Sequence, residues 1–262
     1  MVRKVALAVL LGVLGGVSAI QSAAQAGGSA APARVVVGGQ AAPAGRFPWM
    51  VRLSMGCGGV LTAPRVVLTA GHCVSGTGPD DTIGVTAGSI DLESGAAVKA
   101  RSVAVIRAAG FLHETRGDDW ALVKLDRELD LPVLGLTHGG ADERGPLTII
   151  GWGQTREDSL RQQTRLRYGT VPVIGDEGCA RAYRTVNVEL VRKEAICAGG
   201  SGTDACQGDS GGPLVHETVD HRFVQVGIVS FGLGCARHAY PGVYTQISRF
   251  QADIRRATRV LS

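Results

Sequence analysis

Residues 208–213, Gly-Asp-Ser-Gly-Gly-Pro, have the composition that a nucleophilic serine requires. Such a serine needs an exposed hydroxyl, a nearby general base, and N–H donors for the charge that develops on the substrate oxygen. Glycines on both sides of Ser210 let the backbone turn sharply and let a substrate approach closely. An ordinary glycine-rich turn would account for a bare Gly-x-Ser-x-Gly, but the full hexapeptide directly after Cys206 and Gln207 favours a nucleophile.

Two other segments supply the groups that would activate this serine. His72 lies near the end of the Leu-Thr-Ala-Gly-His-Cys segment at residues 68–73, and Asp119 directly precedes a mostly apolar run at residues 120–125. Taken alone, His72 would be interpreted as a structural histidine and Asp119 as a turn or cap residue. Together with Ser210 they provide a base, an orienting carboxylate and a nucleophile, in the chain order His, Asp, Ser.

This order discriminates between two classes of serine hydrolase. In α/β-hydrolases the nucleophile elbow also reads Gly-x-Ser-x-Gly, but the acid and the histidine follow the serine. Here both precede it, and residues 211–262 are too few to complete an α/β-hydrolase. Alternating strand and helix patterns are also missing from the sequence. These observations exclude an esterase or lipase of that fold.

Short strands separated by turn residues must position these groups. The chain has 262 residues with 45% hydrophobic and 19% charged residues, which predicts a packed core, and its 38 glycines predict many tight turns. The clearest β-branched runs are residues 66–69, 147–150, 171–174 and 224–230. At residues 131–140 the strand pattern is weak, which marks a break between the earlier and the later strands. Phe250, Ile254, Ala257 and Leu261 recur at helical spacing and predict one terminal helix in an all-β protein.

The first residues have the pattern of a secretory signal peptide. Arg3 and Lys4 precede an apolar run at residues 5–20, and Ala24-Gln25-Ala26 offers a small-x-small cleavage site. A membrane anchor is less favoured, because the run falls short of the roughly 20 residues that span a bilayer. We therefore expect a signal peptide at residues 1–26, a short pro-segment at 27–35, and a secreted, extracellular protein that has no membrane association after cleavage.

Charge and cysteine content limit the other classes of function. Lys and Arg number 27 against 23 Asp and Glu, a net charge of +4 that is too small and too dispersed to predict nucleic-acid binding. In an oxidising compartment six cysteines predict three disulfides, with fifteen possible pairings. No Cys-x-x-Cys or His-Glu-x-x-His motif indicates a metal site. The cysteines are Cys57, Cys73, Cys179, Cys197, Cys206 and Cys235.

Several separate motifs give the chain a resemblance to a known family. They lie in this order at residues 36–39, 69–73, 119–122, 151–153, 208–213 and 241–244. With these motifs the sequence resembles the trypsin-like serine proteases of the chymotrypsin family, and in particular the secreted actinobacterial trypsins. The resemblance implies two six-stranded antiparallel β-barrels, at residues 36–137 and 138–262, with the active site in the cleft between them. It also implies the disulfides Cys57–Cys73, Cys179–Cys197 and Cys206–Cys235.

The resemblance assigns roles to the catalytic residues. His72 would take a proton from Ser210, Asp119 would orient the imidazole, and the backbone N–H groups of Gly208 and Ser210 would form the oxyanion hole. Ser230 matches a family position beside the catalytic aspartate. Activity is expected to rise with pH as His72 loses its proton, near or above its ordinary pKa of about 6.5.

Substrate selection would depend on Asp204, which the resemblance places at the base of the primary pocket. Gly232 and Gly242 match the pocket-wall glycines, and Phe231 stands where the family usually has a tryptophan. Ala205 occupies a position where many trypsins carry a serine that helps to hold a lysine through water. We therefore expect cleavage after Arg in preference to Lys.

Activation would involve Val36 and Asp209. In this family the freed α-amino group pairs with the aspartate that precedes the catalytic serine, here Asp209. The motif at residues 36–39 makes Val36 the required terminus, whereas a tryptic cut after Arg34 would leave Val35. We expect Val36 to be the active terminus, produced by cutting after Val35 or by trimming.

The expected partners are polypeptide substrates and protein protease inhibitors, and we expect a monomer that requires no cofactor. Family members often bind a structural calcium, but no acidic loop compels one here, because Asp91 and Glu93 fit a turn equally well. The alternative function is that of a catalytically silent homologue acting as a binding protein. Such a protein would normally have lost one of the three catalytic residues, which are all present.

Overall fold

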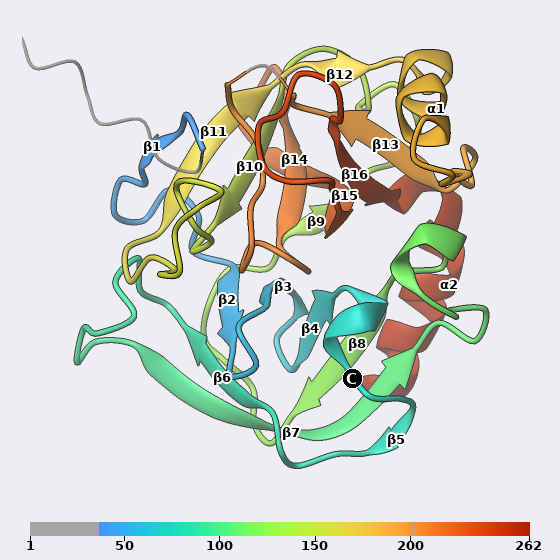
Figure 1. Cartoon of the computed structure of the whole chain (residues 1–262). Helices are drawn as coiled ribbons and strands as arrows, with labels where there is room; N and C mark the ends of the chain where they lie inside the picture. Colours follow the sequence, from blue (N-terminus) through green and yellow to red (C-terminus); the bar gives the residue numbers. More distant parts are fainter. Residues whose placement is uncertain (1–36, 201) are drawn as a thin grey trace, which may run out of the picture. The chain divides into compact units, whose positions relative to one another are not determined.

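Two β-sheets hold most of the regular secondary structure in this computed structural model, which describes residues 37–200 and 202–262 (Figure 1). The expected signal peptide at residues 1–26, the expected pro-segment at 27–35 and Val36 lie outside the described residues. The sheets support the expected all-β class and the two-barrel architecture.

The first sheet closes on itself. Its strand order is β5 (Gly78–Pro79), β7 (Val98–Arg107), β6 (Gly84–Ala87), β2 (Met50–Leu53), β3 (Gly58–Ala63), β4 (Val66–Thr69) and β8 (Ala121–Leu125). The ten residues of β7 are enough for it to pair with β6 through its first half and with β8 through its second. Six strands therefore form a closed antiparallel barrel, with β5 added at the edge of β7.

The second sheet has nine strands, and a proline interrupts one of the strands in its ring. Its order is β1 (Gln40–Ala41), β11 (Arg167–Val171), β10 (Leu147–Gly151), β14 (Pro213–Glu217), β15 (Phe223–Phe231), β16 (Gly242–Gln246), β13 (Ala195–Ala198) and β12 (Val173–Ile174), with β9 (Gly135–Leu136) beside β15. Only Pro172, which has no N–H to donate, separates β11 from β12. Because β11 pairs with β10 and β12 with β13, this interrupted strand joins both ends of a six-strand ring.

The first half of the chain also contributes strands to the second sheet. Gln40 of β1 lies opposite Tyr168 of β11, and Gly135 of β9 lies opposite Val224 of β15. The pairing of β9 with β15 is parallel, unlike the antiparallel pairing expected from the sequence. These exchanges connect the two sheets through backbone hydrogen bonds.

An aromatic cluster packs where the two halves meet. The Phe47 ring, just before β2, lies 5.7 Å from that of Trp49, 5.3 Å from that of Tyr168 and 5.4 Å from that of Phe223. Tyr168 and the half-buried Phe223 belong to the second sheet, so packed rings fix how the sheets approach each other.

The terminal helix is confirmed as α2 (Ile247–Leu261), which packs against β8 and β15 through Phe250 and Ile254. A second helix, α1 (Asp176–Arg184), was not predicted. Its nine residues are mostly polar and too few to form a stable helix alone, so tertiary contacts must hold it. The buried hydroxyl of Tyr183 donates to the Pro241 carbonyl at 2.7 Å, which ties α1 to the second sheet. Neither helix in the described part is long and apolar enough to cross a membrane.

Ile254→Ala is expected to lower the free energy of unfolding by about 2–5 kcal/mol, because it leaves a cavity beneath α2. The matched change Val260→Ala on the same helix should stay within about 0.5 kcal/mol, since Val260 is 70% exposed. Urea unfolding would be followed by fluorescence in a Ser210→Ala background that cannot digest itself. Equal losses in the two variants would contradict the packing of α2 described here.

Candidate active site

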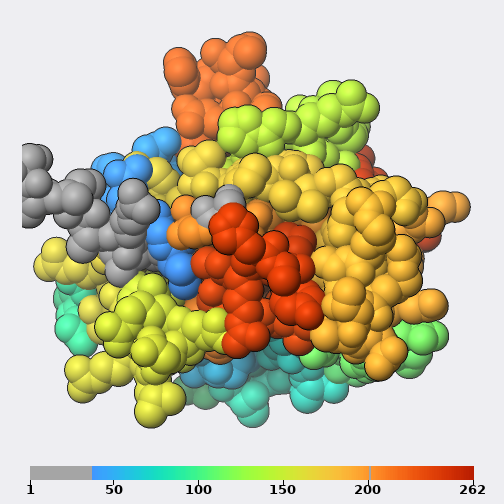
Figure 2. All heavy atoms as spheres, turned by 45° about the horizontal axis from the view of Figure 1, so that its top comes forward, coloured from blue at the N-terminus to red at the C-terminus, as the bar shows by residue number. Residues whose placement is uncertain are grey.

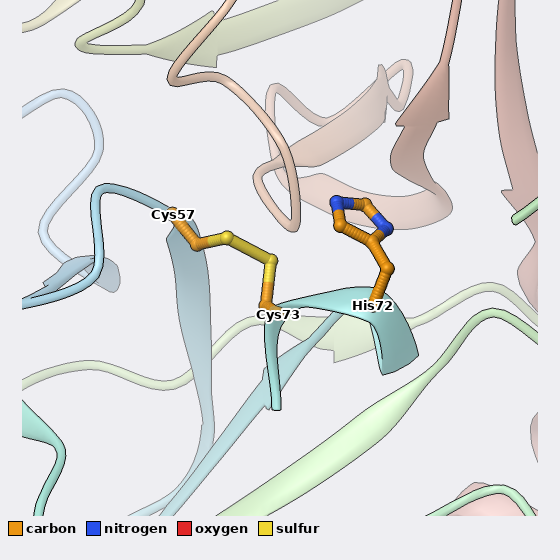
Figure 3. Close-up of side chains that lie close together, drawn as sticks. All are labelled: Cys57, His72 and Cys73. Atoms are coloured by element: carbon orange, nitrogen blue, oxygen red, sulfur yellow. A yellow bond between two sulfur atoms is a disulfide. The ribbon is translucent and has the colours of Figure 1, made fainter. Parts of the chain in front are cut away.

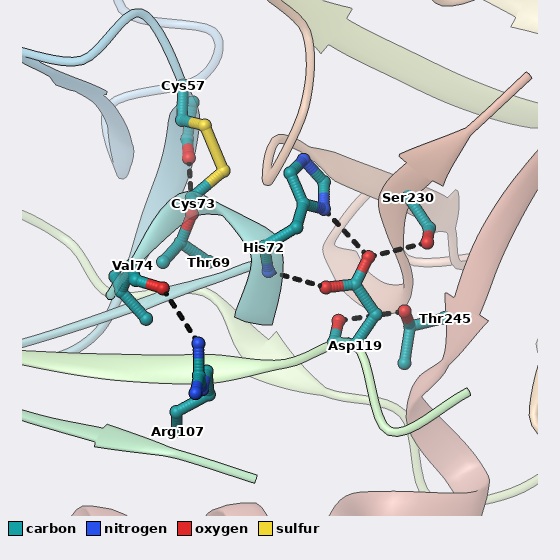
Figure 4. Close-up of polar contacts among 10 residues, drawn as sticks. Cys57, Thr69, His72, Cys73, Val74, Arg107, Asp119, Ser230 and Thr245 are labelled. Carbon is teal, nitrogen blue, oxygen red and sulfur yellow. Dashed lines mark hydrogen bonds and ion pairs between the residues drawn. A yellow bond between two sulfur atoms is a disulfide. The ribbon is translucent and has the colours of Figure 1, made fainter. Parts of the chain in front are cut away.

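Asp119 is buried and its carboxylate is held by donors from both halves of the structure (Figure 4). Oδ1 accepts a hydrogen bond from the backbone N–H of His72 at 2.8 Å, and Oδ2 accepts from Ser230 Oγ at 2.5 Å. His72 Nδ1 lies 2.8 Å from Oδ2, and the Asp119 carbonyl accepts from Thr245 Oγ1 at 2.8 Å. An acceptor at Nδ1 places the proton there and leaves His72 Nε2 free to act as a base.

The fold presents His72 on a short 3-10 helix, Gly71–Cys73, immediately after β4. The disulfide between Cys73 and Cys57 ties this turn to the start of β3 (Figure 3). Nitrogen and sulfur atoms of Cys57, His72 and Cys73 lie within 4.8 Å of one another, a spacing that could hold a metal ion. The sulfurs are joined in the disulfide, so they offer no thiolate ligands.

The electrostatics of His72 are set by opposing effects. Burial disfavours the charged imidazolium, but the hydrogen bond and charge of Asp119, together with the charge of Glu114, outweigh it and raise the pKa of His72 above its ordinary value of 6.5. The side chain is 22% exposed, so the imidazole can exchange protons with a substrate.

Ser210 reaches the first sheet through its own backbone. Its carbonyl accepts a hydrogen bond from the N–H of Gly58 at 2.7 Å. Gly211 packs so closely on the end of β4 that a Cβ there would lie 2.2 Å from Thr69 Oγ1. Within the described residues Ser210 Oγ makes no hydrogen bond to His72, and such catalytic bonds often tighten only when substrate is bound.

Two N–H donors beside Ser210 are free. The N–H of Asp209 donates to Cys206 O at 2.9 Å, and that of Gly211 donates to Val229 O at 2.9 Å. Among residues 37–200 and 202–262, neither the N–H of Gly208, which precedes Asp209, nor that of Ser210, which lies between Asp209 and Gly211, has an acceptor. Gly208 has a φ of +98°, which favours glycine. Two unpaired N–H donors close together in one loop are what an oxyanion hole requires to bind the negative oxygen of the substrate.

Asp209 is fully buried behind this loop. Its carboxylate accepts hydrogen bonds from the N–H groups of Gly153 at 2.7 Å and Cys206 at 2.9 Å. Side chains at Gly151 and Gly153 would collide with it, which explains the Gly-Trp-Gly motif. Burial raises the pKa of Asp209 to about 6, although the two N–H donors and the charge of Arg52 oppose the rise.

A pocket of about 190 Å³ lies next to Ser210, with Asp204 in its lining. Asp204 is 2% exposed, and its carboxylate accepts hydrogen bonds from the N–H groups of Ala205 and Ala236, both at 2.9 Å. Burial raises the pKa of Asp204 to about 7 despite these bonds. In the described part of the chain no cationic side chain pairs with this carboxylate, so the pocket favours a ligand that carries a positive charge.

Glycines line this pocket, so no side chains at these positions project into it. Gly232 and Gly242 face each other, and a Cβ on Gly242 would lie 2.8 Å from Asp204 Oδ1. Phe231 lines the same pocket and packs edge-on against Tyr183. The Asp204 N–H donates to Val37 O at 3.0 Å, so the first described residue of the chain packs against the segment that contains Asp204.

The cysteines pair in the way that the family resemblance implies. The structure joins Cys206 to Cys235 across the pocket and Cys179 of α1 to Cys197 of β13, in addition to the bond beside His72. The pocket lining and the helix behind it are therefore covalently fixed.

Several contributors to the site were not found from the sequence. Two of them lie next to features that the sequence does show. Thr245 comes directly after the motif at 241–244, and Gly58 directly follows Cys57. Glu114 lies in an exposed turn with no sequence signal, and its influence on His72 arises only because the turn folds beside the site.

The two-barrel fold, the Asp119–His72 pair and the serine loop together define a serine peptidase. Residues 36–254 match the family described as Trypsin, and the chain belongs to this family of serine endopeptidases. It is 45% identical over 234 residues to a trypsin-like protease from Streptomyces glaucescens, covering 88% of this chain and 85% of that protein. It is 34% identical to trypsin alpha from Drosophila erecta, covering 81% and 83%, and 32% identical to trypsin beta from the same species, covering 84% and 85%.

Glu114→Gln is expected to move the acidic limb of the kcat/KM profile to lower pH by a few tenths of a unit, because the lost charge no longer raises the pKa of His72. Activity on a small peptide amide would be measured between pH 5 and 9. The matched control is Glu177→Gln, an equivalent neutralisation on the exposed surface of α1. A shift to higher pH, or equal shifts in both variants, would contradict the assigned electrostatics.

Proposed function

We propose that the chain is a secreted trypsin-like endopeptidase that hydrolyses peptide bonds after Arg, and less readily after Lys, through an acyl-enzyme. The observation that carries this proposal is the buried carboxylate of Asp204 in the pocket beside Ser210, which no cationic side chain among residues 37–200 and 202–262 pairs with. An arginine side chain in this pocket would place the carbonyl carbon of the same residue, which is the scissile carbonyl, at Ser210. Its charge would also relieve the cost of ionising Asp204.

The proposed catalytic cycle uses three side chains, those of Ser210, His72 and Asp119. Ser210 Oγ attacks the scissile carbonyl while His72 Nε2 takes its proton, and the developing imidazolium is stabilised by Asp119. The negative oxygen is bound by the free N–H groups of Gly208 and Ser210. His72 then returns the proton to the leaving amine as the peptide C–N bond breaks, which leaves the acyl group on Ser210 Oγ. Water attacks this acyl carbonyl while His72 takes a proton from it, and His72 passes that proton to Ser210 Oγ as the carboxylic acid is released.

The preference for Arg rests on Ala205. Asp204 offers two oxygens, which suit the planar fork of a guanidinium better than the shorter, point-like ammonium of lysine. A hydroxyl at position 205 could support a water bridge to the ammonium, and alanine provides none. Lysine substrates should therefore bind and react less well.

Other aspects of the proposal concern partners and location. Polypeptide substrates and protein protease inhibitors are the partners that the family implies, and we propose an extracellular monomer. We also propose that catalysis needs no cofactor. The Asp91 carboxylate accepts the Glu93 N–H at 3.0 Å and lies 3.4 Å from Arg165 Nε, contacts that fit a turn.

Ser210→Ala is expected to lower kcat on arginyl amides by about a millionfold while leaving the fold unchanged, because the nucleophile is lost. The matched control Ser248→Ala, on α2, should retain full activity.

Wild-type enzyme should cleave arginyl amides about 3- to 10-fold more efficiently than lysyl amides. Ala205→Ser should narrow that difference. Residual cleavage by Ser210→Ala would contradict the triad, and equal turnover of Arg and Lys amides would contradict the pocket assignment.

We further propose that Val36 is the amino terminus of the active enzyme and pairs with Asp209. Because burial raises the pKa of Asp209 from 3.8 to about 6, the precursor loses stability as pH rises through that interval. A paired α-amino group would stabilise the ionised carboxylate of Asp209. It would therefore remove this loss of stability up to about pH 8, where the α-amino group itself deprotonates.

Processing is therefore expected to raise Tm by about 5 °C or more at pH 7, and much less at pH 4. The comparison uses precursor and processed forms of Ser210→Ala, the latter cut in trans by active enzyme. Amino-terminal sequencing of the fully active enzyme should return Val36. A terminus at Val35, or a Tm difference that does not grow between pH 4 and 7, would contradict this assignment.

A further inference from the structure

Arg52, the third residue of β2, reaches from the first sheet to the serine loop of the second. Its Nη1 donates to the carbonyl of Gly208 at 2.7 Å. Its Nη2 donates to the Oε1 of Gln162, which lies in the segment of residues 154–165. One guanidinium therefore bonds two segments that approach from different directions, a geometry that its planar fork permits and an ammonium does not.

Gln162 restrains the same glycine from a second side. A Cβ on Gly208 would lie 2.5 Å from Gln162 Nε2 and 2.6 Å from its Cδ, so the amide side chain covers the α-carbon of Gly208. Gln162 is itself anchored, because the neighbouring Gln163 N–H donates to Trp152 O at 2.8 Å.

The segment that holds Gln162 is exposed but attached. Figure 2 shows it in yellow-green on the surface, beside the red-orange loop after β15. An ion pair between Glu157 and Arg237 joins these two segments. The amide of Gln162 is thus presented to Arg52 by a loop that is fixed at both sides.

Gly208 needs such restraints. Glycine samples backbone conformations that other residues cannot, so its N–H direction is poorly defined without outside contacts. An oxyanion donor must point at the position of the developing charge before the reaction begins. The charge of Arg52 also lies close enough to Asp209 to interact with it, which places a cation directly behind this loop.

We propose that Arg52 is a positioning residue for the oxyanion hole, acting through the carbonyl of Gly208 and oriented by Gln162. The proposal rests on the proposed function, in which the Gly208 N–H stabilises the transition state. It adds a requirement from the first sheet that neither the serine loop nor the Asp204 pocket supplies.

Arg52→Met in processed enzyme should lower kcat on an arginyl amide by about 10- to 100-fold with little change in KM, somewhat less than the loss of an oxyanion donor itself. A peptidyl argininal, whose hemiacetal oxygen occupies the oxyanion hole, should bind more weakly by the same factor. Benzamidine, which needs only the Asp204 pocket, should bind within twofold of wild type. Arg52→Lys should be intermediate, and Gln162→Ala should show a smaller loss with the same pattern.

The matched control is Arg65→Met, which removes a guanidinium that donates to the carbonyls of Leu125 and Asp126 in the same sheet. Its ratio of argininal to benzamidine affinity should equal that of wild type. If Arg52→Met does not fold, Arg52→Lys and Gln162→Ala provide the same ratio.

Two results would overturn the positioning role. One is kcat and argininal affinity within twofold of wild type in the Arg52 and Gln162 variants. The other is an equal weakening of argininal and benzamidine, which would indicate a general structural defect. A wild-type enzyme that neither cleaves arginyl amides nor binds the argininal would instead contradict the proposed function, so the two failures are distinguishable.

Discussion

The carboxylate of Asp119 is the point at which hydrogen bonds join the two sheets in the proposed catalytic site. Asp119 and His72 come from the first sheet, whereas Ser230 and Thr245, which donate to Asp119, come from the second. A buried carboxylate is stable only when its oxygens are satisfied, so the relative placement of the sheets and the orientation of the imidazole are fixed together. The hydrogen bond from the Gly58 N–H to the Ser210 carbonyl likewise fixes the proposed nucleophile to the first sheet.

Within the part of the chain that the structure describes, two other buried carboxylates lack a full counter-charge. Burial raises the pKa of Asp204 to about 7 and that of Asp209 to about 6. Each site would therefore gain most from an incoming cation, which we propose to be the substrate side chain at Asp204 and the processed terminus at Asp209. Arg52 offsets only part of the charge at Asp209. In this account substrate binding and activation use the same physical principle at neighbouring positions in one loop.

The parts of the site that the sequence predicts are those whose chemistry is local. Ser210 and Asp209 share one hexapeptide, and the Cys73 next to His72 marks a turn that must be held. The terminal helix has a clear apolar period, whereas α1 depends on the Cys179–Cys197 bond and on burial of Tyr183. Arg52 carried no signal at all, because its partners lie more than one hundred residues away along the chain. Contacts of this kind arise only when the sheets are assembled.

The most direct test of the central claim is a crystal structure of processed enzyme with a peptidyl argininal. We expect a hemiacetal bond to Ser210 Oγ, with the hemiacetal oxygen bound by the N–H groups of Gly208 and Ser210. The guanidinium should pair with Asp204, and His72 should stay bonded to Asp119. An adduct on any other residue, or a guanidinium outside the Asp204 pocket, would contradict the account.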